Sequence, residues 1–376
     1  MTVLETAGAL TMKCTCDRES LLRHLQVAAR GVSTRTSIQV LAGIQLAARD
    51  GELHLAATDM ELSVRTRLPA EIGAPGVALA PGKLLVDIVR ALGGDAVSLE
   101  LSNGMLTITS DGSTYQLNTF DVEDFPQLPP TTGALFSVDR DAFLDTVQSV
   151  SRSASQDESR PVLTGVKVQI TAERLVMVAT DSYRLSVKDT VLDTDIAEPA
   201  EAIIPARALD ELVRIAEASP AASLAVGVEA NQVIFGVDET WVTARRIEGQ
   251  FPNHQQLIPQ AFEHVAEIDR AELLDVVNRT RLMAQRNSPL RLQFSDGTLT
   301  VSASTQDVGA ATESLPVRYE GEDLVIGFNA DFLRDGVQSF ADDTVRLQLI
   351  SPLRPGLLSC ETDSLVYLIM PVRLPD

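Results

Sequence analysis

Apolar side chains recur at helical spacing in three separate segments of the chain, and an Asp-Arg pair opens each segment. The pairs are Asp17-Arg18, Asp139-Arg140 and Asp269-Arg270. Apolar residues then follow at i, i+3, i+4 and i+7, a pattern typical of a helix that buries one stripe. An aspartate placed directly before a helix can accept hydrogen bonds from the free N–H groups of its first turn. We therefore expect three amphipathic helices with aspartate caps.

A second amphipathic segment follows each of these helices at a regular distance. The segments cover residues 81–92, 205–216 and 329–340, so successive starts are 124 residues apart. This period exceeds the 20–50 residues of solenoid repeats and matches the size of an ordinary domain. The sequence therefore predicts three copies of one domain, over residues 11–130, 131–258 and 259–376. An N-terminal extension, residues 1–10, is expected to be disordered.

Between the paired helices the apolar period changes from helical spacing to two, which is typical of half-buried strands. Four dipeptides stand where a tight hairpin turn needs positive backbone φ angles: Asp50-Gly51, Asn103-Gly104, Asp111-Gly112 and Asp296-Gly297. Each copy thus consists of two helices laid on one antiparallel sheet. The predicted fold class is α+β.

Composition excludes several classes of protein. The formal net charge is −21 over 376 residues, which is typical of a soluble protein that avoids nucleic acid and anionic membranes. The three cysteines are too few for a disulfide framework and suit a reducing cytoplasm. There is no run of 18 apolar residues and no signal-peptide pattern, so we expect a cytoplasmic protein without membrane partners.

The charge is unevenly distributed along the chain. The predicted helices carry slightly more basic than acidic side chains, whereas the remaining residues are strongly acidic. If all helices face one way, a basic surface results that suits non-specific contact with the phosphates of duplex DNA. Helical preference for arginine could produce the same bias without any DNA contact. The candidate DNA-facing residues are Arg23, Arg30, Arg35, Lys83, Arg90, Arg152, Arg160, Arg207, Arg214, Arg279, Arg281 and Arg286.

The sequence offers no convincing catalytic or metal site. Ala57-Thr58-Asp59 and Ala179-Thr180-Asp181 occupy equivalent places in two copies, and a hydrolase hypothesis would use Asp59 or Asp181. The third copy lacks this aspartate, and catalytic carboxylates work as close pairs, so a turn or strand-end role is favoured. The four histidines are scattered without metal-ligand spacing, and neither a phosphate-binding loop nor a nucleophile elbow is present. We expect no catalytic residue, no metal and no cofactor.

Seven motifs are spread along the chain: ATDMELSVRTRL (57–68), DFPQLP (124–129), ATDSYRLSV (179–187), IIPARALDELVRIA (203–216), GQFPNHQQLIP (249–259), IGFNADFLRDGVQSF (326–340) and MPVRL (370–374). Together they resemble those of the bacterial sliding clamps, the beta subunits of DNA polymerase III. The resemblance implies three clamp domains per chain and a head-to-tail homodimer that closes into a ring around duplex DNA. Such a ring is a processivity factor without enzymatic activity.

The resemblance also implies partners and their sites. Replicative DNA polymerase, the clamp loader and repair polymerases would bind through short linear peptides in an apolar cleft. The cleft residues would be Leu163, Thr180, Ser182, Tyr183, Arg184, Leu185, Pro252, Leu257, Leu368, Met370, Pro371, Val372, Arg373 and Leu374. The dimer contact would join Tyr115 and Leu117 of one copy to Leu282 and Met283 of the other.

The chain departs from the family pattern near the implied cleft. Ser182-Tyr183 stands where the family often has Gly-His, Gln256 replaces a common basic residue, and Pro375-Asp376 extends the usual end. A different class of function, an acidic scaffold of tandem modules that binds only proteins, would share the repeats. Retention on closed circular DNA would separate it from the clamp hypothesis.

Overall fold

The computed structural model describes residues 11–33, 36–131, 133–192, 194–284, 288–306 and 309–374. The predicted N-terminal extension, residues 1–10, lies outside this range, as do Arg35, Arg286 and the Pro375-Asp376 end. The chain forms two compact units. The first comprises Met1–Ser137 and Arg214–Arg246, and the second comprises Val138–Val213 and Ile247–Asp376.

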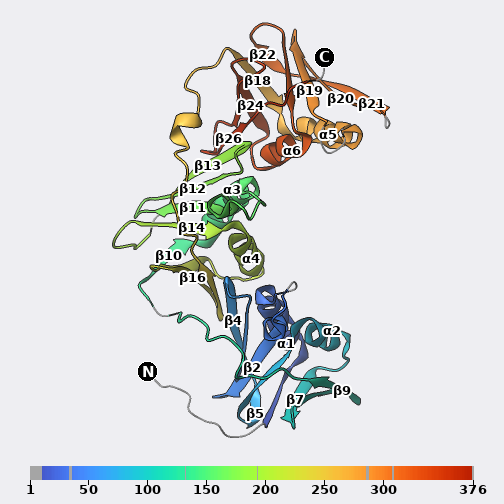
Figure 1. Cartoon of the computed structure of the whole chain (residues 1–376), viewed down its shortest axis with the longest axis vertical. Helices are drawn as coiled ribbons and strands as arrows, with labels where there is room; N and C mark the ends of the chain where they lie inside the picture. Colours follow the sequence, from blue (N-terminus) through green and yellow to red (C-terminus); the bar gives the residue numbers. More distant parts are fainter. Residues whose placement is uncertain are drawn as a thin grey trace. The chain divides into compact units, whose positions relative to one another are not determined.

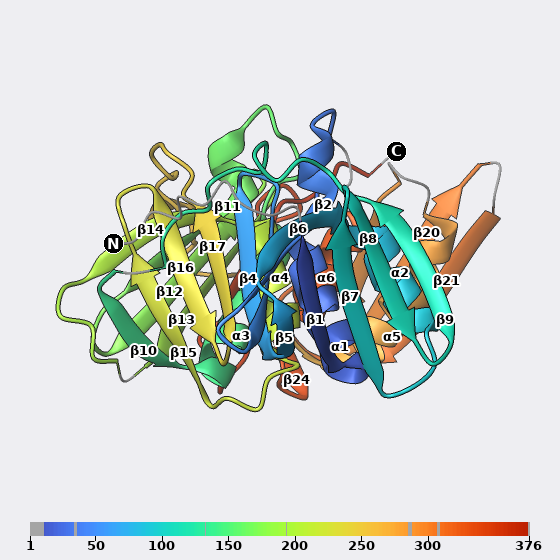
Figure 2. The ribbon, with the colours of Figure 1, turned by 90° about the horizontal axis from the view of Figure 1, so that it is seen from below.

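The first unit contains helices α1 (Arg18–Ala28) and α2 (Gly82–Ala91) and two antiparallel sheets. The five-stranded sheet has the order β5 (Glu71–Ala74), β1 (Met12–Asp17), β7 (Ala96–Ser102), β8 (Met105–Ser110) and β9 (Ser113–Asn118). The eight-stranded sheet has the order β10 (Leu135–Asp139), β15 (Ser223–Val228), β16 (Gln232–Val237), β17 (Thr240–Arg245), β4 (Leu62–Pro69), β3 (Glu52–Thr58), β2 (Gly43–Arg49) and β6 (Gly76–Pro81). Both helices cover one face of these sheets (Figures 1 and 2) and bury their apolar stripes in a common core.

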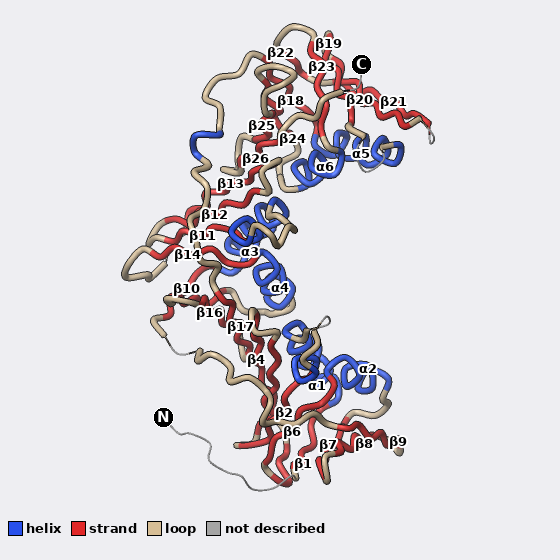
Figure 3. Tube along the Cα trace, viewed as in Figure 1, coloured by secondary structure: helices blue, strands red, loops and turns tan. Residues whose placement is uncertain are grey.

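The second unit contains α3 (Arg140–Val150), α5 (Arg270–Thr280) and α6 (Ala330–Gln338), together with most of α4 (Ala206–Ala216). Its nine-stranded sheet has the order β14 (Ala200–Pro205), β11 (Gly165–Ile170), β12 (Arg174–Thr180), β13 (Arg184–Val191), β26 (Val366–Ile369), β25 (Gly356–Ser359), β24 (Thr344–Leu349), β18 (His264–Asp269) and β22 (Arg318–Glu320). A four-stranded sheet has the order β21 (Gly309–Pro316), β20 (Thr298–Thr305), β19 (Leu290–Ser295) and β23 (Leu324–Phe328). Within this unit α3, α5 and α6 lie on the same side of the strands (Figure 3).

The predicted helix starts are confirmed together with their caps. The side chain of Asp17 accepts a hydrogen bond from the Ser20 N–H at 2.7 Å, and Asp139 and Asp269 accept equivalent bonds at 2.8 Å. Asn329 caps α6 by accepting from the N–H groups of Asp331 and Phe332. These caps satisfy backbone donors that a helix cannot satisfy itself.

The predicted hairpin turns are also confirmed. Asp50, Asn103, Asp111 and Asp296 have φ angles of 54°, 52°, 43° and 40°, and the glycine after each has a φ between 73° and 78°. Two consecutive residues with positive φ match the right-handed twist of the flanking strands. The sequence pattern thus located these turns correctly.

One prediction was too simple: the strands of a repeat do not form one sheet. In the first repeat they divide between the five-stranded and the eight-stranded sheet. The larger sheets also continue from one repeat into the next, because β4 pairs with β17 and β13 pairs with β26. Such pairing satisfies the N–H and C=O groups that an isolated repeat would leave unpaired along its edges.

Candidate functional site

The last strand of the chain lies beside the strand that follows the Ala179-Thr180-Asp181 motif. In the antiparallel pairing of β13 with β26, Arg184 is opposite Ile369 and Leu185 is opposite Leu368. Beyond β26, the N–H of Met370 donates to the carbonyl of Tyr183 at 2.8 Å. The pairing therefore brings the two halves of the predicted peptide-binding set together within the second unit.

The C-terminal segment then crosses onto β23 of the four-stranded sheet. Pro371 forms a β-bridge with Phe328, and the Val372 N–H donates to the Gly327 carbonyl at 2.8 Å. A Cβ atom at Gly327 would lie 2.6 Å from the Val372 oxygen and 2.8 Å from a methyl carbon of Leu374. Glycine at this position therefore allows the segment to lie close against the strand.

An apolar cluster underlies these residues. Leu185 and Leu368 are buried in it with Val178, Ile203, Phe251 and Leu357. Val162, Ile247 and Ile258 pack against the cluster and anchor their chain segments beside it. These segments carry three residues of the predicted peptide-binding set: Leu163 in the 3₁₀ helix Pro161–Thr164, Leu257 in the 3₁₀ helix Gln255–Leu257, and Pro252. The sequence had not singled out Val162, Phe251 or Ile258, because ordinary apolar residues carry no signal of a shared cluster.

Several neighbouring apolar side chains remain exposed. Tyr183 is 60% exposed, Leu257 52%, Met370 40% and Val372 36%. Together with the buried cluster they provide apolar area that an incoming peptide could cover. A surface of this kind favours binding of apolar peptide side chains over small polar substrates.

Arg184 is a buried cation at the margin of this surface. It donates to Asp181 at 3.0 Å and to Asp335 of α6 at 2.7 Å, and its guanidinium carbon lies 4.4 Å from the centre of the Phe332 ring. Burial alone lowers the pKa of Arg184, but Tyr367, Asp335 and Asp181 outweigh it, so the pKa is raised. Arg184 therefore stays charged and fixes its side of the surface in position.

The two Thr-Asp motifs form turns, which is the role favoured by the sequence. Asp59 accepts from the N–H groups of Glu61 and Leu62, and Asp181 accepts in the same way from Tyr183 and Arg184. Met60 and Ser182, which follow the aspartates, have φ angles of 76° and 80°. The carboxylates are thus occupied in holding strained turns, and this gives no support to the hydrolase hypothesis.

Most of the candidate DNA-facing residues lie on helices or directly after them. Arg23 on α1 and Lys83 and Arg90 on α2 are exposed in the first unit, as is Arg214 on its part of α4. In the second unit the exposed candidates are Arg152, Arg160, Arg207 and Arg279. Two candidates are half-buried: Arg281 in the second unit and Arg30 in the first. Several of them pair with acids: Arg90 with Asp87, Arg160 with Asp157, Arg279 with Glu313 and Arg281 with Asp331, at 2.6–2.9 Å.

The candidate dimer residues lie near sheet edges that have no neighbouring strand among the described residues. Tyr115 and Leu117 are on β9, the last strand of the five-stranded sheet, and β21 is the last strand of the four-stranded sheet. Tyr115 is 41% exposed and Leu282 is 72% exposed in the 3₁₀ helix Arg281–Met283, where Met283 is half-buried. Leu117 is only 7% exposed and packs into the core of the first unit. Its side chain is therefore occupied, and only its backbone is available to a second copy.

The described residues contain no group of three or more side chains arranged to hold a metal ion. Within the same ranges, no helix has the length and apolar character needed to cross a membrane.

Comparison with known proteins finds relatives that match this chain over nearly its whole length. Three family models match: the N-terminal domain of the DNA polymerase III beta subunit over residues 12–129, its central domain over 137–253 and its C-terminal domain over 255–373. The beta sliding clamp of Streptomyces coelicolor is 34% identical, covering 96% of this chain and all of the relative. That of Synechococcus elongatus is 32% identical with the same coverage.

Solved structures are similar as well. The DNA polymerase sliding clamp from Bacillus subtilis superposes with a TM-score of 0.89 at 26% identity, covering 97% of this chain and 100% of that one. The beta sliding clamp of C. crescentus gives 0.90 at 27% identity, covering 97% and 99%. This chain therefore belongs to the DNA polymerase III beta subunit family, the sliding clamps that serve as processivity factors of DNA polymerase.

Proposed function

We propose that two copies of this chain close head to tail into a ring that encircles duplex DNA and tethers replication and repair proteins to it. The observation that carries the proposal is the position of the exposed basic residues. Arg23, Lys83 and Arg279 lie on helices whose opposite stripes are buried against the sheets, in a chain with a net charge of −21. A duplex next to the helices would meet cations, and elsewhere it would be repelled.

The proposed hold on DNA is topological and needs only weak contacts. Arg90 and Arg279 pair with acids but are exposed, and exposed ion pairs contribute little to stability, so phosphates can replace these acids at little cost. Contacts of this kind are sensitive to salt and independent of base sequence. Sliding therefore stays possible while the closed ring prevents escape.

Ring closure is proposed to use the two free edges. Strands β9 and β21 each have one side without a neighbouring strand in the described chain. Pairing of β9 of one copy with β21 of another would extend both sheets and cover their open N–H and C=O groups. Tyr115, Leu282 and Met283 would then lie at the contact, with Leu117 contributing its backbone. Since the contact is heterologous, two of them close a ring.

The surface between β13, β26 and residues 249–259 is proposed to bind the linear peptides of polymerases and the clamp loader. The exposed Tyr183, Leu257, Met370 and Val372 and the underlying apolar cluster support this assignment. A relative from Pseudomonas aeruginosa, at 26% identity, has been crystallised bound to griselimycin. The carboxyl of Asp181 and the guanidinium of Arg184 would set the polar rim of the site.

Further expectations remain proposals. We propose domain boundaries near residues 130 and 258, a cytoplasmic location, and no enzymatic activity. The family of non-catalytic processivity factors to which the chain belongs supports the last of these. The turn roles of Asp59 and Asp181 support it too.

A retention experiment tests the ring. The protein is loaded by a clamp loader onto nicked circular DNA, freed of unbound protein by gel filtration, and half of the sample is linearised. We expect retention on circles and rapid loss from linear DNA. Equal retention on both forms would show binding without encirclement, and an absence of retention on circles would favour the protein scaffold.

A charge reversal tests the DNA-facing assignment in the same experiment. Arg23→Glu combined with Lys83→Glu should weaken loading and make its loss with salt less steep, because fewer cations would then contact the phosphates of the proposed duplex. The matched control is Arg318→Glu on β22, whose side chain is 81% exposed but lies away from the helices in sequence and sheet position. Equal effects of the two changes would contradict the assignment.

A further inference from the structure

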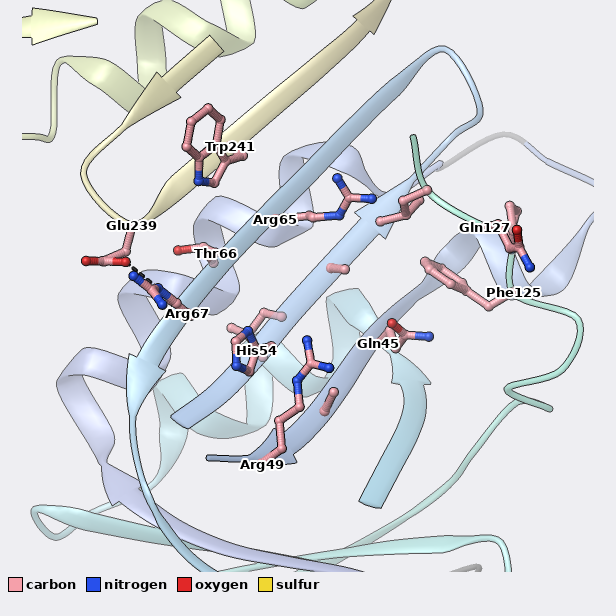
Figure 4. Close-up of a pocket in the computed structure, with 15 residues that line it drawn as sticks. Gln45, Arg49, His54, Arg65, Thr66, Arg67, Phe125, Gln127, Glu239 and Trp241 are labelled. Atoms are coloured by element: carbon pink, nitrogen blue, oxygen red, sulfur yellow. Dashed lines mark hydrogen bonds and ion pairs between the residues drawn. The ribbon is translucent and has the colours of Figure 1, made fainter. Parts of the chain in front are cut away.

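A pocket lies on the eight-stranded sheet of the first unit, on the face opposite helices α1 and α2. Its volume is about 560 Å³, and Figure 4 shows Arg49, Arg65, Arg67 and Trp241 around it. The lining residues Gln45 and Ala47 of β2 flank Leu46, and Arg65 of β4 follows Val64; the side chains of Leu46 and Val64 are buried. The proposed function uses neither this face nor these residues.

Strand register explains the hollow. Across β17, β4, β3 and β2, one row of paired residues is Trp241, Arg65, Ala56 and Gln45, and the next row is Arg67, His54 and Ala47. Directly opposed side chains on one face lie about 4.5–5.5 Å apart at Cβ. Ala56 and Ala47 therefore form a low floor, and the long side chains around them form walls. The segment from Phe125 to Leu128 closes one side.

Among the described residues that line this pocket, Arg65 is a cation that forms no ion pair. Its side chain is half-buried, and burial lowers its pKa. No described residue forms a hydrogen bond or an ion pair with the guanidinium of Arg65, whereas the side chain of Arg67 is held by Glu239 and Glu52. A partly desolvated guanidinium lacking a partner favours binding of an anion, since a carboxylate or phosphate can accept two parallel hydrogen bonds from it.

Trp241 provides a flat apolar wall next to Arg65. It is opposite Arg65 in the β17–β4 pairing and is half-buried. A Cβ atom at Gly236 on β16 would lie 2.7–3.0 Å from three atoms of the indole ring, so the ring rests on the glycine. A ring held in this way costs little entropy when a second aromatic ring stacks on it.

The second repeat has different residues at the strand positions that line this pocket in the first repeat. Strands β12 and β13 correspond to β3 and β4, with Asp181 aligned on Asp59. Where the second repeat has Val176, Val178 and Val187, all members of the apolar cluster or packed on it, the first repeat has His54, Ala56 and Arg65. Both places also have a Phe-Pro pair in the following linker, Phe125-Pro126 and Phe251-Pro252. One architecture therefore supplies an apolar surface in one repeat and a basic pocket in the other.

We propose that this pocket binds a nucleoside phosphate, with the phosphate at Arg65 and Arg49 and the base stacked on Trp241. Three arginines against one lining carboxylate, Glu239, give the pocket a positive charge that suits a phosphate. The pocket is large enough for a mononucleotide. The acidic character of the whole chain disfavours a long polyanion such as single-stranded DNA, so a small ligand is the better match.

Intrinsic fluorescence tests the proposal directly, because Trp241 is the only tryptophan in the chain. The full-length protein is titrated with AMP, ATP, adenosine or inorganic phosphate at constant ionic strength, with excitation at the red edge of the indole band. We expect a saturable change with AMP and ATP, a weaker response to phosphate, and none with adenosine. A response to adenosine equal to that of AMP, or no response up to about 10 mM, would overturn the proposal.

Variants distinguish pocket binding from a general charge effect. Arg65→Gln should raise the half-saturating AMP concentration about tenfold or more, because it removes the bidentate donor. Ala56→Val should also weaken binding by filling the floor, and the second repeat tolerates valine at the equivalent Val178. The control is Arg291→Gln, an exposed arginine of the second unit. Unchanged AMP binding in Arg65→Gln, or a response to an acidic peptide but not to nucleotides, would overturn the assignment.

Discussion

Arg184 of β13 donates a hydrogen bond to Asp335 of α6 across 2.7 Å, although the two residues are 151 positions apart in the chain. Both side chains are largely buried, with exposed fractions of 10% and 16%. The pair links the second repeat to the third, directly beside the surface proposed to bind peptides. Its integrity therefore bears on both stability and recognition.

Replacing Asp335 by Asn should destabilise the protein and weaken peptide binding. The buried guanidinium would keep Asp181 but lose its second carboxylate, and we expect a loss of about 1–3 kcal/mol in the free energy of unfolding. Urea unfolding measures the loss, and fluorescence anisotropy with a labelled polymerase peptide measures binding. Asp331→Asn on the same helix is the control, because its side chain is 60% exposed and should cost under about 0.5 kcal/mol. Equal losses for the two variants would contradict the role assigned to Asp335.

Replacing Leu282 by Asp should convert the proposed dimer into monomers. Leu282 is 72% exposed in the chain, so the charge costs the monomer little, whereas burial of an unpaired carboxylate at a contact is expensive. Light scattering after size exclusion measures the molecular mass. Leu353, which is 70% exposed, offers a matched control as Leu353→Asp. A dimer that persists in Leu282→Asp, or dissociates equally in Leu353→Asp, would rule out the proposed contact.

The native protein should expose one reactive thiol at pH 8. Burial raises the pKa of Cys14 to about 11 and that of Cys16 to about 12, where Cys14 and Asp17 add to the effect. Burial also raises the pKa of Cys360, but this thiol is half-exposed and a reagent can reach it. Ellman's reagent should therefore react quickly with Cys360 alone and with all three thiols only in denaturant. Cys360→Ser should abolish the fast phase. Three fast thiols in the native protein would contradict the buried position of β1.

The same two cysteines predict the direction of a pH effect on stability. Their folded pKa values lie above the unfolded value of 9.0, so the native state holds its protons longer than the unfolded chain. The contribution of the two thiols to the free energy of unfolding is complete below about pH 9 and is lost as the pH rises toward 12. Urea unfolding of the wild type against Cys14→Ala between pH 8 and 10.5 measures this slope.

The sequence predicted the local structure well because the signals are local. Aspartate caps, Asp-Gly and Asn-Gly turns and apolar periodicity each lie within a few residues of what they determine, as at Asp17 and Asp50. The pairing of β13 with β26 has no such signal, since Leu185 and Leu368 could equally belong to separate sheets. The family resemblance brought these residues together before the structure did, but it did not assign Asp335 or Phe332 to the peptide-binding set.

The arginine pocket could not be predicted because it depends on register. Ala47, His54 and Arg67 come from three strands, and a shift by one residue would send each side chain to the other face of the sheet. In the sequence, Arg65 and Arg67 alternate with Val64, Thr66 and Leu68 and have the pattern of any solvent-facing strand. Only the pairing with Trp241 shows that Arg65 lies in a hollow.

Gly327 provides a test of the peptide surface that leaves the chain complete. In Gly327→Ala the new methyl group would meet the Val372 oxygen and the Leu374 side chain at under 3 Å, and the Val372 oxygen belongs to the backbone, which leaves little room for adjustment. We expect the segment after Met370 to detach from β23, because its hydrogen bond and bridge there cannot form at that distance. Peptide affinity should fall about tenfold or more, with the oligomeric mass unchanged.

Deletion of residues 370–376 gives the limiting case of the same change. It removes Met370 and Val372 from the surface and should abolish peptide binding, while β9 and β21 remain as they are. The control substitution is Gly73→Ala on β5, where a Cβ atom would meet only the flexible Lys13 side chain at 3.3 Å. Peptide affinity that is unchanged in both the deletion and Gly327→Ala would place the peptide site elsewhere on the chain. A monomeric deletion variant would instead show that the C-terminal segment contributes to the dimer contact.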